Sequence, residues 1–478
     1  MNVGNCSSVK FGTSGARGLV ADLTDTVCYT FTRAFLETVA SGAEAVVIGH
    51  DLRPSSPAIT RACIAAITEA GCRAIYVGAL PTPAIAFFAM KNRLPAVVVT
   101  GSHIPFDRNG IKFYRAQGEI SKADEEAIMA VDVEVPETVG IQPLPEPERM
   151  ALDAYLHRYA DFFRPGSLSG MRVALYEHSS VARDIIRAML ETLGAEVLPL
   201  GRTDSFVPVD TEAVREEDVL LAERWAREIG FDALVTTDGD ADRPMIADEN
   251  GAWMRGDIVG ILTAVAVEAQ VAVTPVSSST ALEKSGLFES VIRTKIGSPF
   301  VIEGMQQADF RKTVAGFEAN GGFLLGSDLL RDERKLSALP TRDALLPVLA
   351  LLTMAWERKL KVSELPSILP PRFTASDRIK DFPNGKSRAI IVGLAASPEA
   401  ARRLLAPDCG PVSEVDETDG FRATFHSGDI VHLRPSGNAP ELRCYTESDS
   451  SARARRLCEE CLLRIVHQHA DTIFGIID

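Results

Sequence analysis

The chain has 478 residues, enough for about three or four domains at roughly 150 residues each. Its 50 lysines and arginines face 65 aspartates and glutamates, which gives a formal net charge of −15. This acidic balance disfavours nucleic acid or an anionic membrane as the main partner, whereas a small anionic substrate needs only a local group of cations.

Several features indicate where the protein works. The N-terminal segment lacks the apolar stretch of a signal peptide, and the apolar run 258–275 is interrupted by Glu268 and Gln270. The eight cysteines are scattered along a long chain, as is typical of reduced thiols in the cytosol. Cys458 and Cys461 form a CxxC pair without a second pair of ligands nearby, which favours buried thiols on an amphipathic helix over a metal or redox site. We therefore expect a cytoplasmic protein without a membrane segment.

Short β-branched runs alternate with helical patterns over the first three quarters of the chain, which is typical of βαβ units on largely parallel sheets. Pro-rich segments at 135–149 and 363–372 indicate boundaries between blocks. Strands are expected at 45–49, 73–78 and 95–100, then at 171–176, 196–200 and 232–237, and then at 270–276, 291–296 and 312–318. Helices are expected at 56–71 and 342–359.

The last hundred residues have a different pattern. Closely spaced strands are expected at 388–393, 421–426, 429–435 and 441–447, followed by a long C-terminal helix. This spacing favours an antiparallel α+β domain. We predict an α/β protein with three α/β domains that contain mixed sheets, at 1–150, 151–255 and 256–370, and a smaller C-terminal α+β domain at 371–478.

The first candidate site lies where the strand at 95–100 ends. The turn that follows presents Ser102 at the carboxyl end of the strand, where α/β sheets place their ligands. The hydroxyl of Ser102 is suited to act as a nucleophile, with His103 or Lys112 nearby for proton transfer. The alternative is a serine that only caps a helix in a polar turn.

The second candidate site is the acidic loop 236–246. Asp238, Asp240 and Asp242 alternate just past a strand, so their carboxylates can converge on one hard cation such as Mg²⁺, Mn²⁺ or Ca²⁺. An EF-hand is disfavoured because Arg243 stands at the sixth position, where that loop needs glycine. A solvated acidic turn is the other alternative.

Two further loops carry polar side chains suited to a sugar phosphate. Glu318 and Asn320 follow a strand and can bind vicinal sugar hydroxyls, although Asn-Gly-Gly is also typical of a tight hairpin. The segment 432–445 can form a phosphate nest, or it can be a structural Gly-Asn turn. Its candidate phosphate ligands are Arg434, Ser436, Gly437, Asn438 and Arg443.

Six segments in this order resemble the α-D-phosphohexomutase family, which includes bacterial phosphomannomutases and phosphoglucomutases. They are FGTSGARG (11–18), GHDLRPSS (49–56), TGSHIP (100–105), DGDADR (238–243), FEANGG (317–322) and RPSGNAPELRCY (434–445). The resemblance implies three α/β domains and a smaller fourth domain around a central cleft. It also implies transfer of a phosphoryl group between O1 and O6 of a hexose.

The resemblance assigns a role to each candidate residue. Ser102 becomes the phosphoserine with His103 beside it, Lys112 the general acid/base, and Arg17 and Arg243 the cations facing the transferred phosphoryl group. The implied metal ion is Mg²⁺, bound by Asp238, Asp240, Asp242 and an oxygen of phosphorylated Ser102. The implied substrate ligands are Lys295, Glu318, Asn320, Arg434, Ser436, Gly437, Asn438 and Arg443.

The sequence also departs from the family pattern. The sugar loop of the family usually reads Glu-x-Ser-Gly-His, whereas Asn320 and Gly322 stand in place of its serine and histidine, and Ser298 follows Gly297 where His or Asp is frequent. We expect a phosphomannomutase that works through a hexose 1,6-bisphosphate, as a monomer or homodimer acting on small sugar phosphates. The alternatives are a phosphoglucomutase, a phosphoglucosamine mutase, or a non-catalytic sugar-phosphate sensor of the same fold.

Overall fold

The computed structural model describes residue 3 and residues 9–12, 15–436 and 440–473. The chain divides into two units. The first unit contains Met1–Val273 and Gly297–Pro366, and the second contains Thr274–Ile296 and Ser367–Asp478.

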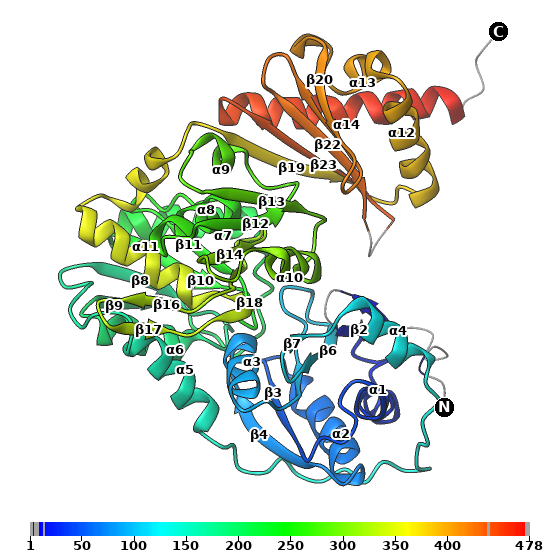
Figure 1. The fold of residues 1–478 in the computed structure, drawn as a ribbon, viewed down its shortest axis with the longest axis vertical. Coiled ribbons are helices and arrows are strands. Elements are labelled where there is room, and N and C mark those ends of the chain that lie inside the picture. Colours follow the sequence, from blue (N-terminus) through cyan, green and yellow to red (C-terminus); the bar gives the residue numbers. More distant parts are fainter. Residues whose placement is uncertain (1–2, 4–8, 13–14, 437–439, 474–478) are drawn as a thin grey trace. The chain divides into compact units, whose positions relative to one another are not determined.

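The first sheet of the first unit has the strand order β1-β2-β6-β5-β3-β4, with β7 beside β6 (Figure 1). β3 is parallel to β4 and β5, whereas β6 is antiparallel to β2 and β5. Its strands are β1 (Lys10–Gly12), β2 (Gly15–Leu19), β3 (Ala45–His50), β4 (Arg73–Ala79), β5 (Ala96–Val99), β6 (Arg108–Arg115) and β7 (Gly118–Glu119).

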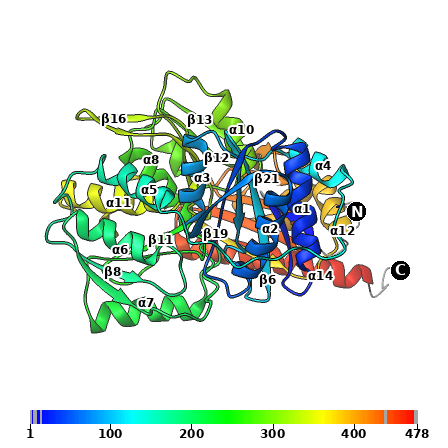
Figure 2. The ribbon, with the colours of Figure 1, turned by 90° about the horizontal axis from the view of Figure 1, so that it is seen from below.

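Helices cover both faces of this sheet. Val46, Ile48 and Val97 alternate along their strands and belong to the same core as α1 (Asp25–Thr38) and α2 (Ser56–Glu69), which lie side by side (Figure 2). On the other face, α3 (Thr82–Lys91) packs so closely that a Cβ at Gly49 would lie 2.6 Å from Ile85 Cδ1. Burial on both faces explains the uninterrupted apolar strands of the sequence. A short helix, α4 (Lys122–Ala130), follows β7.

The second sheet has the order β11-β10-β8-β9. β8 is parallel to β9 and β10, and β11 returns antiparallel to β10, so the β10–β11 connection is a tight loop at the carboxyl end of β10. The elements are α5 (Met150–Ala160), β8 (Arg172–Tyr176), α6 (Arg183–Thr192), β9 (Glu196–Leu200), α7 (Glu216–Glu228), β10 (Ala233–Thr237) and β11 (Pro244–Ala247).

The third sheet includes β12, β14, β15 and β18 in that order, and β12 crosses the boundary between the units. β14 is parallel to β12 and antiparallel to β15. The elements are α8 (Gly256–Ala266), β12 (Val271–Pro275), α10 (Ser298–Gln307), β14 (Val314–Phe317), β15 (Phe323–Leu325), the hairpin β16 (Leu329–Arg331) and β17 (Arg334–Leu336), β18 (Leu339–Asp343), α11 (Leu345–Arg358) and a 3₁₀ helix (Val362–Ile368).

The second unit is built on the antiparallel sheet β19-β23-β22-β21-β20. Glu447 accepts hydrogen bonds from the Thr280 N–H and from Arg372, which fastens the segment 274–296 to this sheet. The elements are α9 (Ala281–Lys284), β13 (Ser290–Thr294), β19 (Phe373–Ile379), α12 (Asn384–Ala396), α13 (Pro398–Leu405), a 3₁₀ helix (Pro407–Cys409), β20 (Val412–Asp416), β21 (Phe421–Phe425), β22 (Ile430–Pro435), β23 (Leu442–Ser448) and α14 (Ser451–Ile473).

One predicted strand is wrong. Residues 388–393 lie inside α12, where Ile390 and Ile391 pack against the core of the sheet and Val392 is exposed. A short apolar run has the same appearance in a strand and in a helix, and here the packing of one helical face decides. Cys458 and Cys461 are both buried on α14. None of the helices in the described part of the chain has the length and hydropathy that a membrane crossing requires.

Candidate active site

Ser102 lies in the turn after β5 and has a left-handed backbone conformation, with φ +53°. For most residues other than glycine this conformation costs about 1–2 kcal/mol. The Ser102 N–H donates to Thr100 Oγ1 at 2.8 Å, and the Ser102 carbonyl accepts from Arg53 at 3.0 Å, so both backbone groups of the residue are fixed. Strain of this kind concentrates at functional sites.

Arg53 is fully buried and donates hydrogen bonds to carbonyl groups along the turn 101–108 that contains Ser102. A Cβ on Gly101 would lie 2.5 Å from Arg53 Cζ, so only glycine fits there. Arg53 Nε lies 3.3 Å from Asp51 Oδ2, which compensates the buried charge. The guanidinium donates to four backbone carbonyls at 2.5 to 3.0 Å, those of Ser102, Ile104, Pro105 and Arg108.

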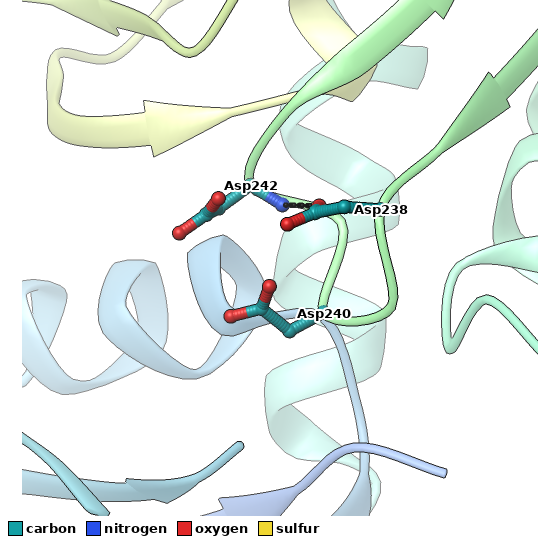
Figure 3. A group of neighbouring side chains, drawn as sticks. All are labelled: Asp238, Asp240 and Asp242. Carbon is teal, nitrogen blue, oxygen red and sulfur yellow. Dashed lines mark hydrogen bonds between the residues drawn. The ribbon is translucent and has the colours of Figure 1, made fainter. Parts of the chain in front are cut away.

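The β10–β11 loop gathers three buried carboxylates around a common space (Figure 3). Ligand oxygens of Asp238, Asp240 and Asp242 lie within 4.8 Å of one another. Asp238 Oδ1 accepts from the N–H groups of Asp242 and Arg243 at 3.1 and 3.2 Å, which shapes the loop. Ala241 takes φ +57° within it.

The donor set fits a hard divalent cation. Asp240 Oδ1 and Asp242 Oδ1 are buried and accept no hydrogen bond from any described residue. Burial, reinforced by the charge of Asp240, raises the pKa of Asp238 well above its usual value. Three buried carboxylates, two of which have an oxygen that accepts no hydrogen bond from a described residue, are the kind of ligands that Mg²⁺, Mn²⁺ or Ca²⁺ prefers. The predicted convergence of these residues is therefore seen in the structure.

Ser102 points at this loop. Its Oγ donates to Asp238 Oδ2 at 2.6 Å and lies 3.2 Å from His103 Nδ1. Arg243 lies 3.1 Å from the same nitrogen, and since a guanidinium can only donate, His103 Nδ1 must accept. Burial, together with the charges of Arg243 and Arg17, lowers the pKa of His103 well below its usual value, which agrees with a neutral ring.

Lys112, on β6, bridges two of the carboxylates. Its Nζ lies 2.7 Å from Asp240 Oδ2 and 2.7 Å from Asp242 Oδ2. Burial alone would lower the pKa of Lys112, but the charges of the two carboxylates raise it above its usual value. Thr82 Oγ1, at the start of α3, donates to Asp240 Oδ2 at 2.6 Å. Lys112 is therefore a charged, well-held proton donor beside the serine turn.

Arg17, on β2, is a second cation of the site. Burial, with contributions from the charges of Arg243 and Arg342, lowers the pKa of Arg17 to about 10, so the side chain remains charged at neutral pH. Its guanidinium makes no hydrogen bond or ion pair to any described residue. Arg17 is thus available to an anionic ligand.

The sugar loop, which we define as 317–322, lies beside the β10–β11 loop, which we call the metal loop from here on. Arg342, on β18, donates to Glu318 Oε2 at 3.1 Å and to Asp242 Oδ2 at 2.9 Å. Asn320 uses its Oδ1 to accept from the Gly322 N–H at 2.9 Å. The amide nitrogen of Asn320 donates to no other described residue, and Oδ1 keeps a second lone pair, so both atoms can serve a ligand.

The remaining predicted ligands belong to the second unit. Arg434 Nε lies 3.3 Å from Asp419 Oδ2, and the same carboxylate accepts from the Ile296 N–H at 3.0 Å, beside Lys295. Arg434 is the register partner of Arg443 across β22 and β23. The Ser436 N–H donates to the Glu441 carbonyl at 2.9 Å. Gly437 and Asn438 lie outside the described residues.

Within the first unit, the structure brings together Ser102, His103, Lys112, Arg17, Arg243, the three aspartates and Glu318. Sequence reasoning missed Arg53, Thr82 and Arg342. Arg53 lies in the segment 49–56 and could have been selected there, whereas nothing near Thr82 or Arg342 marks them. Ser298 Oγ donates to Glu119 Oε2 at 2.9 Å at the start of α10, so this departure from the family pattern has a structural partner.

Four family models match successive parts of the chain. They describe phosphoglucomutase/phosphomannomutase alpha/beta/alpha domain I at residues 8–132, domain II at 153–251, domain III at 255–373 and the C-terminal domain at 383–463. The chain belongs to the phosphoglucomutase/phosphomannomutase family. The resemblance to α-D-phosphohexomutases and the predicted multidomain α/β fold are confirmed.

Named relatives extend over nearly the whole chain. A phosphomannomutase of Salmonella muenchen is 46% identical, with 96% of each chain covered. A phosphomannomutase of Sinorhizobium fredii is 42% identical over 95% of this chain and 98% of the relative. The crystal structure of a putative phosphomannomutase from Thermus thermophilus has the same fold, with a TM-score of 0.77 at 22% identity over 97% of this chain and 100% of the other.

Proposed function

We propose that this enzyme is a phosphohexomutase that interconverts mannose 1-phosphate and mannose 6-phosphate through phosphorylated Ser102 and a hexose 1,6-bisphosphate. The observation that carries the proposal is the 2.6 Å hydrogen bond from Ser102 Oγ to Asp238 Oδ2, because a hydroxyl held against buried carboxylates is suited to act as a nucleophile beside a cation. Relatives at 46% and 42% identity that are named phosphomannomutases support mannose as the sugar.

The reaction needs positioning and charge neutralisation more than covalent activation. The bond between phosphorus and Ser102 Oγ breaks while a bond forms from phosphorus to the oxygen of the free sugar hydroxyl, and one proton passes in net terms from that hydroxyl to Ser102 Oγ. After the bisphosphate reorients, the reverse transfer of its other phosphoryl group restores phosphorylated Ser102. Lys112 is protonated, so its Nζ donates a proton to Ser102 Oγ as that bond breaks and then takes up the proton that the sugar hydroxyl loses. Arg17 and Arg243 bind the phosphoryl oxygens.

Asp238, Asp240 and Asp242 would hold Mg²⁺ together with an oxygen of phosphorylated Ser102. Bound there, the ion supplies positive charge against the phosphoryl oxygens. The neutral ring of His103 accepts from Arg243 and thereby orients this guanidinium toward the serine.

The sugar and its second phosphate need their own ligands. Glu318 and Asn320 would bind the sugar hydroxyls. The phosphate that is not being transferred would be bound by ligands of the second unit, namely Lys295, Arg434, Ser436, Gly437, Asn438 and Arg443. With its buried thiols and its sugar-phosphate substrates, the enzyme would work in the cytoplasm, as a monomer or homodimer.

A coupled assay on four substrates tests the reaction and the sugar together: the 1-phosphates of mannose, glucose, glucosamine and N-acetylglucosamine. Turnover that is fastest with mannose 1-phosphate supports the proposal. Preference for glucose or glucosamine would instead identify a phosphoglucomutase or a phosphoglucosamine mutase. Binding without any turnover would identify a sugar-phosphate sensor.

Two variants test the residues. Ser102→Ala is expected to lose nearly all turnover and the phosphate found by peptide mapping, whereas Ser205→Ala, at an exposed serine of the same unit, is expected to keep both. Treatment with EDTA is expected to abolish turnover and added Mg²⁺ to restore it. Full activity after EDTA treatment, or of Ser102→Ala, would contradict the assignment.

A further inference from the structure

Arg342 connects two loops that are far apart in sequence. It is buried on β18, with one guanidinium nitrogen 2.9 Å from Asp242 Oδ2 in the metal loop and another 3.1 Å from Glu318 Oε2 in the sugar loop. Arg342 thus pairs with one carboxylate from each loop, so the residue that orients Glu318 also holds Asp242.

Gly322 provides the space for this arginine. A Cβ at Gly322 would lie 2.7 Å from Arg342 Cδ and 2.9 Å from its Cγ, distances that real Cβ atoms do not show. Gly322 is not among the glycines with positive φ, so its backbone could accept another residue. Glycine is required here because the stem of Arg342 occupies the place of a side chain.

The two contacts of Arg342 have opposite consequences for ligand binding. Its charge stands against Asp242, one of the cation ligands, and therefore opposes a divalent ion in the loop. The same charge holds the carboxylate of Glu318 in a fixed position and keeps it from turning toward the ion. A rigid Glu318 binds sugar hydroxyls at a lower entropic cost.

We propose that Arg342 is a positioning residue that orients Glu318 for the sugar and weakens the affinity of the metal loop for its divalent ion. The inference rests on the proposed sugar-phosphate function for its sugar half, whereas its metal half depends only on the geometry of the first unit. Arg342 therefore couples the two ligands, since it lowers the affinity for the divalent ion and raises the affinity for the sugar.

The opposite signs make the inference testable with Arg342→Met, which keeps the volume and removes the charge. A Ser102→Ala background is expected to lose nearly all turnover, so Mn²⁺ binding can be followed by electron paramagnetic resonance and mannose 1-phosphate binding by calorimetry. At an effective dielectric constant near 20, loss of a neighbouring cation is expected to tighten Mn²⁺ binding at least about tenfold. Sugar-phosphate binding is expected to weaken at least about tenfold through loss of the held carboxylate.

Further variants separate charge, geometry and space. Arg342→Lys keeps the charge but loses the fork, so Mn²⁺ affinity is expected to stay within about twofold of the parent while sugar-phosphate affinity falls. Gly322→Ala displaces the arginine and is expected to move both affinities in the same directions as Arg342→Met. In the double variant the added methyl group is expected to have little further effect, because the two changes act on one contact.

Arg158→Met is the matched control. Arg158 is also a buried arginine beside β18, where it donates to the Ser337 carbonyl and lies 3.8 Å from Asp343. A purely structural disturbance of this strand is expected to leave Mn²⁺ affinity unchanged or weaker. Weaker or unchanged Mn²⁺ binding in Arg342→Met, or unchanged sugar-phosphate binding in that variant, would overturn the inference. If the parent protein bound no sugar phosphate, the proposed function would fail, while the tightened Mn²⁺ binding would still test the role of Arg342.

Discussion

Replacement of Arg53 by methionine is expected to inactivate the enzyme from outside the reacting groups. Arg53 makes no hydrogen bond to a described residue of the metal loop, yet it donates to four carbonyls of the Ser102 turn and pairs with Asp51. Methionine fills the volume but provides no donor. Asp51 would then be a buried carboxylate without its cation.

The structure sets the size of the effect. Removal of one partner of a buried ion pair typically costs about 3–5 kcal/mol, and carbonyls that lose charged donors add to it. Part of the cost is relieved if the turn opens to water, and that opening would displace Ser102. A displacement of about 1 Å at a reacting group can cost about a hundredfold in rate.

Hydrogen exchange is a suitable assay because a multidomain protein does not unfold in one step. The amides of residues 100–110 are expected to exchange at least about a hundredfold faster in Arg53→Met, and turnover is expected to fall by a similar factor. Arg61→Met, in α2 of the same unit, serves as the control, since Arg61 is only half-buried and donates no hydrogen bond to a described residue. Unchanged protection at 100–110 together with turnover within tenfold of the parent would refute the reasoning.

Three further predictions concern single side chains. Ser102→Gly is expected to be as inactive as Ser102→Ala but to melt at a higher temperature, because glycine relieves a left-handed strain of about 1 kcal/mol; equal melting temperatures would contradict this. Burial lowers the pKa of His432 from 6.5 to about 4. The second unit therefore has its full stability above pH 6.5, where the ring is neutral in the folded and in the unfolded state. As the pH falls from 6.5 to 4, the free energy of unfolding is expected to decrease by about 3 kcal/mol, because only the unfolded state takes up the proton. His432→Gln is expected to flatten this dependence in hydrogen exchange of β21 and β22, and an unchanged slope would exclude His432 as its source. The ratio of kcat/KM between mannose 1-phosphate and glucose 1-phosphate is expected to stay within about 200-fold, and Asn320→Ser is expected to reduce it further. A preference above a thousandfold in the parent enzyme would contradict this and would show that O2 of the sugar has a dedicated partner.

Much of the fold follows from local patterns. The buried parallel strands at 45–50 and 96–99 contain the β-branched runs 46–48 and 97–99, and apolar residues on both faces are what a doubly covered sheet requires. The strand at 373–379, FTASDRI, lacks this signal because it has no buried residue and pairs only with β23 in the sheet order. The run 388–393 gave the opposite error, since its apolar residues serve a helix that is covered on one side only.

The candidate site was predictable where the chemistry lies in one loop. Three alternating aspartates after a strand converge because β10 and β11 form a tight hairpin, and this follows from spacing alone. Arg342 donates to Asp242 from 100 positions further along the chain, and Thr82 donates to Asp240 across a separation of 158 positions. Such contacts depend on how sheets are placed within the unit, and no periodicity in one sequence encodes that.

The departures from the family pattern in the sugar loop have a common physical explanation. Gly322 removes a side chain from the loop, and the stem of Arg342 fills the vacated space from β18. Asn320 Oδ1 accepts from the Gly322 N–H at 2.9 Å, which closes the loop. The amide nitrogen can donate to a sugar oxygen, and Oδ1 keeps one further lone pair as an acceptor. Glu318 is the one carboxylate of the loop, and Arg342 fixes its orientation through the 3.1 Å hydrogen bond to Oε2, so under the proposed function this contact would decide how the loop presents its charged acceptor to the sugar.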